Sequence, residues 1–173
     1  MKNGKGRKME VKLIGRDELS ACEKIYSDAR GFMRECGNGG QWGDSYPPRE
    51  QIVSDIERGA LYGIYELTVL VGVFYFAKER EPSYADIYSG SWLSDGEYGV
   101  IHRVAVSSAA RGRGVVRTCF DFCKGLCDSL RIDTHEDNIP MQSALSKAGF
   151  VKCGKIMLAR GGERIAYQWV SDL

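Results

Sequence analysis

The chain has 173 residues, with 24 Lys and Arg against 23 Asp and Glu, so its formal net charge is +1. That length suits one domain with a sizeable core and falls short of two comfortable ones. A nearly neutral chain offers no overall electrostatic reason to bind nucleic acid or an anionic membrane. We find no apolar run long enough for a transmembrane helix and no signal-peptide pattern, so we expect a soluble, cytoplasmic protein.

Hydrophobic periodicity and turn residues predict strands mixed with helices along the whole chain. Residues 1–8 are basic and glycine-rich with nothing to bury, and we expect a flexible tail before a single domain at 9–173. In chain order we expect a strand at 9–15, a helix at 17–34, a glycine-rich loop at 36–48, a helix at 48–59, strands at 60–67 and 69–77, turns at 79–97, a strand at 98–106, a helix at 112–130, a strand at 130–137, a helix at 138–150, and strands at 150–159 and 162–170. This order predicts a domain of mixed α/β (α+β) class.

Six cysteines are present, and no two of them form a Cys-x-x-Cys pair. Cys119, Cys123 and Cys127 recur every four residues on the helix expected at 112–130. They fall on two apolar stripes of that helix, while charged residues occupy its opposite side. We therefore expect reduced core residues and no metal site, since a structural zinc site usually wants four converging ligands.

The stretch "VAVSSAARGRGVV", Val104 to Val116, joins an apolar strand to this helix through two glycines. The first amides of a helix have no partner within it, and glycines leave the neighbouring amides uncovered. Such a turn, with Arg111 and Arg113 beside it, is typical of a site for an anion such as a pyrophosphate. A plain strand-to-helix turn with solvated arginines has the same pattern, so the turn alone leaves both interpretations open.

Further motifs accompany this turn. Residues 106–115 fit the pattern V-x4-[RQ]-G-x-G-[AVIL] between a strand and a helix, and "NIPMQSALSKAGF" follows downstream at 138–150. Together they resemble the two cofactor motifs of the GCN5-related N-acetyltransferase (GNAT) superfamily, over about residues 10–170. The stretches "QWGDSYP", "IHRVAV" and "RIDTHEDN" are similar to a bacterial subgroup of small acetyltransferases. This closer likeness identifies no substrate.

The resemblance implies a single domain with a central, mostly antiparallel sheet, splayed between its fourth and fifth strands and flanked by helices. It implies acetyl-CoA as co-substrate and no metal. Strand backbone freed by the splay would pair with the pantetheine arm, and the amides of the glycine turn would hold the pyrophosphate. The residues that it assigns to the cofactor are Val104, Ala105, Val106, Arg111, Gly112, Arg113, Gly114, Val115, Val116, Asn138 and Met141.

Acetyl transfer to an amine needs a neutral amine, a polarised thioester carbonyl and a leaving thiolate. His102 is the first candidate for the base, because related enzymes often carry Glu or His at this position and an imidazole titrates near ~6.5. We expect it on the same strand face as Val104. His135, the other histidine, also falls beside the expected cleft. Both histidines also have ordinary structural interpretations, as a buried hydrogen-bonded residue and a solvated loop residue.

The general acid is where the chain departs from the family pattern. Many members place a Tyr five residues before the Phe of the Gly-Phe pair, and here that position is Leu145. Tyr98, Tyr46 or a water could take its place, or the thiolate could leave unaided. The sequence does not choose among these.

On the acceptor side, Trp42 and Tyr46 could wall a pocket or could simply anchor their loop to the core. Glu97 is a candidate for holding a cationic amine, as are Asp44, Asp133 and Glu136, although all four could be solvated surface carboxylates. The sequence thus predicts an acetyl-CoA-dependent N-acetyltransferase that acts on the primary amine of a small molecule by direct attack in a ternary complex. The alternatives are a protein or peptide N-acetyltransferase and a non-catalytic acyl-CoA binding module. We expect neither nucleic acid nor membrane as a partner, and a homodimer stays open.

Overall fold

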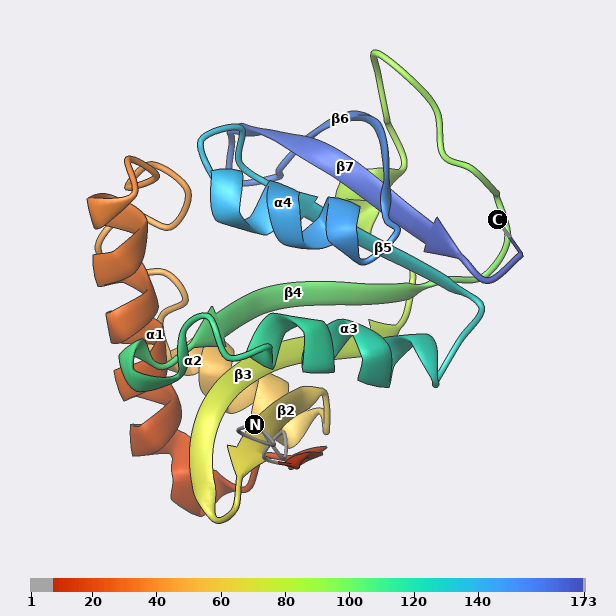
Figure 1. The fold of residues 1–173 in the computed structure, drawn as a ribbon. Helices are drawn as coiled ribbons and strands as arrows, with labels where there is room; N and C mark the ends of the chain where they lie inside the picture. The colour runs from red at the N-terminus through yellow and green to blue at the C-terminus, as the bar shows by residue number, and fades with distance from the viewer. Residues whose placement is uncertain (1–7, 173) are drawn as a thin grey trace, which may run out of the picture.

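The computed structural model describes residues 8–172 and has one seven-stranded sheet with helices on both faces (Figure 1). The strands are β1 (Met9–Leu13), β2 (Leu61–Glu66), β3 (Val69–Lys78), β4 (Gly99–Val106), β5 (Ser129–Thr134), β6 (Val151–Met157) and β7 (Glu163–Val170). The helices are α1 (Leu19–Glu35), α2 (Arg49–Glu57), α3 (Val115–Lys124) and α4 (Ile139–Lys147), with short 3₁₀ turns at Arg16–Glu18, Pro82–Tyr84 and Ser108–Ala110. The expected mixed class and the single central sheet are confirmed; the expected tail at 1–8 lies, apart from Lys8, outside the described residues.

The strands are ordered β1-β2-β3-β4-β5-β7-β6, and every neighbouring pair is antiparallel except β4 with β5. That parallel pair is held only at Gly99 opposite Leu130 and Val100 opposite Arg131. Beyond these residues the two strands diverge, and Figure 1 shows the gap widening toward the ends of β4 and β5 nearest α1. The splay that the resemblance implied is therefore present.

Three apolar clusters fill the two faces of this sheet. Helices α3 and α4 pack on one face, where Phe120 and Leu145 are fully buried among strand residues. Helices α1 and α2 pack on the other face around Tyr26 and Ile52. A third cluster, around Tyr84, lies where the segment 79–98 covers β4 and its neighbours. Within residues 8–172, no helix is both long enough and apolar enough to span a bilayer.

The largest difference from the sequence-based boundaries lies between α3 and β5. The helix expected at 112–130 ends at Lys124, and β5 begins at Ser129, one residue before the strand expected there. Gly125 caps the end of the helix, where its amide donates to the carbonyl oxygens of Asp121 and Phe122, and the next residues turn the chain back toward the sheet. Cys127 therefore lies in this connection rather than on the helix, half-buried, with its Sγ 3.2 Å from the carbonyl oxygen of Ser129.

All six cysteines are free thiols, and only Cys36 is exposed. Burial raises the pKa of the Cys22 thiol to about 12 and the pKa of Cys127 above its ordinary value. Because the thiolate is the reactive form, both burial and the raised pKa slow alkylation. Among residues 8–172, no group of three or more His, Cys, Asp or Glu side chains is arranged to hold a metal ion.

We therefore expect one fast-reacting thiol in the native protein and six after unfolding. Brief alkylation near neutral pH, followed by mass spectrometry, should add a single label to Cys36, and the Cys36→Ser variant should add none. Unfolding in denaturant without reductant should then expose every remaining thiol. Two labels fewer than expected in denaturant would reveal a disulfide and contradict the reduced core.

Candidate active site

The geometry of the site begins with an extra residue in β4. Tyr75 of β3 is opposite His102 and Val73 is opposite Ala105, so two residues of β4 stand against the single Phe74. Arg103, within this bulge, has a φ of 52°, in the left-handed region that an arginine rarely adopts. The bulge interrupts the alternation of the strand, and His102 and Arg103 both line the same cavity.

The expectation that His102 shares a face with Val104 is therefore wrong. Ile101 and Val104 pack on the α3 face of the sheet, on either side of the bulge. A regular strand would place Ile101 and Val104 on opposite faces, because successive side chains alternate. The extra residue removes that alternation and leaves His102 on the face opposite Val104.

A buried ion pair holds the bulge in place. Asp55 of α2 is 1% exposed and accepts two hydrogen bonds from Arg103, from Nε at 2.8 Å and from Nη2 at 3.0 Å. Gln51 donates a third hydrogen bond to Asp55 at 2.9 Å, and the hydroxyl of Tyr26 donates to the carbonyl oxygen of Arg103 at 3.0 Å. Two helices thus fix the backbone and the side chain of one strained residue.

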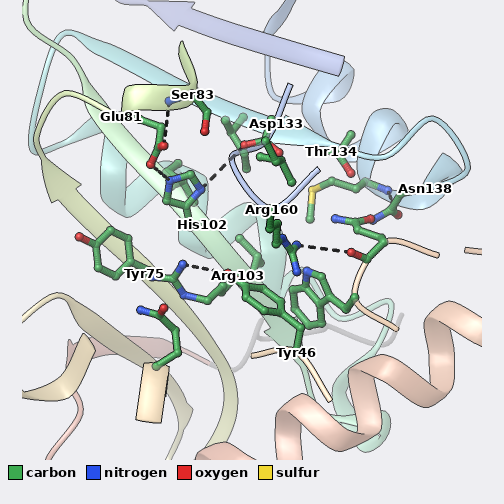
Figure 2. Close-up of a pocket in the computed structure, with 18 of the residues that line it drawn as sticks. Tyr46, Tyr75, Glu81, Ser83, His102, Arg103, Asp133, Thr134, Asn138 and Arg160 are labelled. Carbon is green, nitrogen blue, oxygen red and sulfur yellow. Dashed lines mark hydrogen bonds and ion pairs between the residues drawn. The ribbon is translucent and has the colours of Figure 1, made fainter. Parts of the chain in front are cut away.

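Beside the bulge lies a cavity of about 460 Å³, which we call the acceptor cavity (Figure 2). Its wall combines β4 with the ends of β3 and β5, the loop that follows α1, and the turn between β6 and β7. The polar or charged side chains on this wall include Tyr46, Tyr75, Glu79, Glu81, His102, Arg103, Asp133, Thr134 and Arg160. Thr134 is fully buried, and its hydroxyl makes no hydrogen bond in the part of the chain described.

His102 lies between two carboxylates in this cavity, as Figure 2 shows. Its Nε2 is 3.1 Å from Oε2 of Glu81, and its Nδ1 is 3.9 Å from Oδ1 of Asp133. The hydrogen bond with His102 holds the pKa of the Glu81 carboxyl down at about 2, helped by the backbone amide of Ser83. Glu81 is therefore ionised at any working pH and orients the imidazole.

Trp42 and Tyr46, predicted to be either pocket walls or loop anchors, serve as both. Trp42 is 8% exposed, meets the rings of Tyr26 and Tyr46 edge-on, and also lines the acceptor cavity. Tyr46 lines the cavity too, and its hydroxyl accepts a hydrogen bond from Nη1 of Arg103 at 3.3 Å. A loop of this length keeps its shape because these rings are packed into the core.

A second cavity of about 710 Å³, which we call the cofactor cavity, lies on the other side of Val104. Helix α3 begins at its edge, and the first backbone bond of that helix runs from the amide of Thr118 to the carbonyl oxygen of Gly114 at 3.0 Å. The amides of Val115, Val116 and Arg117 precede that bond, so the helix supplies them with no partner. Val115, Val116 and Arg117 all line the cavity.

The two glycines of the turn are needed for their backbone conformation and for the space beside them. Gly112 has a φ of 75° and Gly114 a φ of 86°. A Cβ built on either would meet no atom within 4 Å, so it would stand in the open space of the cavity that both line. Lys124, Lys147 and Arg117 add positive charge to the same wall, against the single carboxylate of Asp121.

The two arginines of the turn occupy different positions relative to the cofactor cavity. Arg111 lines the cofactor cavity, donates to the carbonyl oxygen of Asp28 at 2.9 Å and stacks 4.2 Å from the centre of the Phe32 ring. Arg113 forms an ion pair with Glu66 and does not line that cavity. Its amide also donates to the carbonyl oxygen of Ala110 at 3.3 Å. Of the two, only Arg111 is placed to meet a ligand there.

The two cavities meet at four residues that line both: Met33, Val104, Asn138 and Met141. The side chain of Asn138 caps α4 by accepting from the amide of Met141 at 3.1 Å. Its Nδ2 also donates to Oε1 of Gln41 at 2.8 Å. The predicted wall formed by Asn138 and Met141 therefore lies where the cavities join. Val104 lies at the same junction, on the part of β4 that no longer pairs with β5.

Like Arg113, Asp44 and Glu136, three further sequence-predicted residues line neither cavity: Tyr98, His135 and Glu97. The hydroxyl of Tyr98 accepts from the amide of Glu81 at 3.2 Å, and its ring packs 4.0 Å from the guanidinium of Arg131. Nδ1 of His135 accepts from the amide of Asp137 at 3.1 Å within a turn. Glu97 is exposed on the segment that covers the third cluster. The structure brings none of these three together with His102 in a cavity.

Sequence reasoning missed Glu81, Arg103, Asp55 and Arg160. Glu81 lies in a segment whose sequence carries only turn signals. Its local features are that it precedes Pro82 and that its side chain accepts a hydrogen bond from the amide of Ser83. Nothing in "IHRVAV" indicates a bulge, so the sequence predicts an ordinary strand residue at Arg103. These residues reach the site through contacts that no local pattern encodes.

Comparisons with known proteins agree with this geometry. The family model described as Acetyltransferase (GNAT) family matches residues 21–150. An acetyltransferase of the GNAT family from Streptococcus agalactiae 2603 is 32% identical, with a TM-score of 0.88 over 95% of this chain and 96% of that one. Among curated proteins, none matches this chain.

More distant structures share the fold. Salmonella typhimurium yncA, a putative acetyltransferase solved with its cofactor acetyl-CoA, is 16% identical with a TM-score of 0.62, over 95% of this chain and 94% of that one. A chain of the NatC complex bound to Gag peptide and CoA is 13% identical with a TM-score of 0.62, over 94% of this chain and 98% of that one. At these identities the likeness concerns the fold alone.

The buried pair beneath the bulge leads to a stability prediction. The Asp55→Ala substitution would leave Arg103 buried without its counter-charge, and we expect it to lower the free energy of unfolding by about 3 kcal/mol or more. The matched control is Asp44→Ala, because Asp44 is 94% exposed and sits 3.5 Å from Arg34, and it should change stability little. Denaturant unfolding of both variants gives the comparison, and equal effects would contradict the role of the pair.

Proposed function

We propose that this chain, which belongs to the acetyltransferase (GNAT) family, transfers the acetyl group of acetyl-CoA to the primary amine of a small molecule by direct attack in a ternary complex. The observation that carries the proposal is the pair of cavities that meet where β4 parts from β5. One has bare helix amides and positive charge, and the other holds an imidazole between carboxylates. Two substrates bound in these cavities would meet at their junction.

The bare helix amides and the positive charge of the cofactor cavity support binding of a nucleotide thioester there. The amides of Gly112, Gly114, Val115 and Val116 would hold a pyrophosphate, with Arg111 and Arg117 nearby. The two glycines have room beside them that a side chain would fill, which is what close approach of a phosphate requires. Backbone groups of Val104 and Val106, left unpaired on the β5 side, would pair with the amides of the pantetheine arm.

Acetyl-CoA supplies an acetyl group that is already activated as a thioester. The part left to this chain is to hold the amine in line, to remove its proton and to polarise the carbonyl. We assign proton removal to His102, directly or through a water, because it lines the acceptor cavity with Glu81 fixing its ring. The backbone near Val104 is the expected partner of the carbonyl oxygen.

No tyrosine stands at the position where many family members keep their acid. Leu145 there is fully buried in the core between α3, α4 and the sheet. Of the two tyrosines considered as substitutes, Tyr46 lines the acceptor cavity and Tyr98 does not. The thiolate therefore either receives its proton through Tyr46 or water, or leaves without assistance.

A release assay for free thiol separates this proposal from its alternatives. Turnover with small amines supports it, and turnover only with peptides indicates a protein N-acetyltransferase instead. Tight binding of acetyl-CoA without turnover on either panel would indicate a binding module.

We expect the Gly112→Val substitution to weaken acetyl-CoA binding at least tenfold, about 1.4 kcal/mol, because the side chain would stand where the phosphates approach. Gly37→Val is the matched control, since Gly37 has a φ of 77°, also has nothing within 4 Å and lines neither cavity. Backbone strain should therefore be similar in both variants. Calorimetry on the folded proteins decides, and equal affinities in the two variants would contradict the phosphate site.

We expect His102→Ala to lower turnover by roughly 10²-fold or more and to leave acetyl-CoA affinity nearly unchanged. The variant has no ring nitrogen at this position to take the proton, so its turnover should stay low at every pH from 6 to 9. His135→Ala is the control, because His135 is the other histidine and lines neither cavity. One amine must be used throughout, since the amine titrates as well. A His102→Ala protein with near-wild-type turnover from pH 6 to 9 would make His102 a structural residue.

A further inference from the structure

The charges that line the acceptor cavity show what kind of acceptor would complement it. Most of these charged side chains already lie beside a side chain that carries the opposite charge or can acquire it on protonation. The pairs are Arg58 with Glu79 at 2.6 Å, Arg103 with Asp55 at 2.8 Å, and His102 with Glu81 at 3.1 Å. Asp55 lies behind the cavity wall, and the other five residues line the cavity. The two arginine pairs need no charge from a ligand. When the imidazole is neutral, Glu81 keeps two close hydrogen-bond partners, Nε2 of His102 and the amide of Ser83, at 3.1 Å each.

Arg160 is the cation left over. It lies in the turn between β6 and β7, and in Figure 2 it projects into the space between Asp133 and Tyr46. Its guanidinium carbon is 3.8 Å from the centre of the Tyr46 ring, and its Nη2 is 3.5 Å from the carbonyl oxygen of Gln41. Within residues 8–172 it forms no ion pair with a carboxylate.

A second guanidinium lies behind this end of the acceptor cavity and does not line it. Arg164 of β7 is 5% exposed and donates to the same carbonyl oxygen of Gln41 at 3.0 Å and to that of Glu163 at 2.9 Å. It too has no carboxylate within 4.0 Å among the residues described. Two cations thus converge on one neutral oxygen, which makes this end of the cavity attractive to an anion.

Asp133 is the anion left over. Its side chain on β5 is 10% exposed, and its Oδ1 accepts from the hydroxyl of Tyr84 at 2.7 Å. Its nearest titratable nitrogen is Nδ1 of His102 at 3.9 Å, and this imidazole must be neutral to act as a base. When His102 is ready to accept a proton, Asp133, like Glu81, has no counter-charge within 4.0 Å in the described chain, and the more distant Arg164 offsets the charge of Asp133 only in part.

We propose that the acceptor is a small amine that also carries an anionic group, with its ammonium beside Asp133 and its carboxylate or phosphate on Arg160. Such a molecule supplies both of the charges that the cavity lacks, whereas a simple amine supplies one. A peptide N-terminus supplies only the ammonium at this distance, because its first carboxyl is an amide.

This inference rests on the proposed acetyl transfer and names its substrate class. The bound ammonium first releases one proton to water and becomes a neutral amine. In the transfer the amine nitrogen then bonds to the acetyl carbonyl carbon and loses a second proton to His102. The bond from that carbon to sulfur breaks, and its electron pair goes to sulfur. A proton then reaches the sulfur, so an amine and an acetyl thioester give an amide and a free thiol.

The test compares acceptors in pairs that differ in the anion. L-leucine is paired with L-leucinamide for a carboxylate, and O-phosphoethanolamine with ethanolamine for a phosphate. We expect kcat/KM to be at least tenfold higher for the anionic member of at least one pair, and that pair identifies the anion. The amine of leucinamide is the less basic of its pair, so chemistry alone would favour the amide. Equal or lower kcat/KM for both anionic members would overturn the inference.

Two variants test whether Arg160 causes the preference for an anionic acceptor. Arg160→Gln should raise KM for the preferred anionic acceptor about tenfold or more, with little change in its kcat or in KM for the uncharged partner. Arg16→Gln is the control, because Arg16 is exposed, pairs with Glu57 at 2.8 Å and lines neither cavity. The same KM for the anionic acceptor in both variants would remove Arg160 from the site.

Binding measurements distinguish a failure of this inference from a failure of the proposed function. Calorimetry with CoA-saturated protein measures the affinity of each acceptor whether or not transfer occurs. Tighter binding of an anionic member without turnover would support the acceptor class and contradict the transferase. Turnover on amines without regard to the anion would support the transferase and contradict the acceptor class. No detectable binding of any acceptor, or turnover only with peptides, would also overturn the acceptor class.

Discussion

The parting of β4 from β5 is the constraint on which the rest of the molecule depends. Two residue pairs, at Gly99 and Val100, hold the strands together, and beyond them the facing backbone of β4 has no strand to pair with. Backbone groups in a sheet need partners, so an open edge inside a sheet is stable only beside solvent or a ligand. Both cavities open along that edge, and the first turns of α3 and α4 border it.

The bulge at Arg103 lets one strand serve both cavities. Before it, Ile101 packs toward α3 and His102 faces the acceptor cavity; after it, Val104 again packs toward α3 and meets the cofactor cavity. The strained residue is held through its side chain by Asp55 and through its carbonyl by Tyr26. Strain of this kind persists only where the surroundings over-determine it, and here two helices do so.

Gln41 joins three separate segments into one wall of the acceptor cavity. Its side-chain oxygen accepts from Asn38 and Asn138 at 2.8 Å each, and its carbonyl oxygen accepts from Arg164. A loop after α1, the start of α4 and the β6–β7 hairpin therefore share one residue. His102 is positioned by the sheet, whereas these loops form the facing part of the cavity wall. Under the proposed function this would divide chemistry from acceptor specificity, as is usual for sites built on a rigid scaffold.

Local patterns in the sequence determined the elements, the mixed class and the glycine turn, because periodicity, positive-φ glycines and helix starts are properties of neighbouring residues. They also placed Val104, Gly112, Asn138 and His102 at cavity walls through the family resemblance. The helix after the turn ended early, at Lys124, because its last apolar positions belong to the connection into β5.

Only the tertiary structure decided the polar network around His102. Glu81 is 21 residues from His102, and Asp55 is 48 residues from Arg103. Arg160 reaches Gln41 across 119 residues. The bulge that turns Arg103 into the cavity arises from pairing with β3 and from the hold of α1 and α2. Side chains so far apart in sequence meet only when the sheet assembles, and the charges they leave unpaired exist only in that assembly.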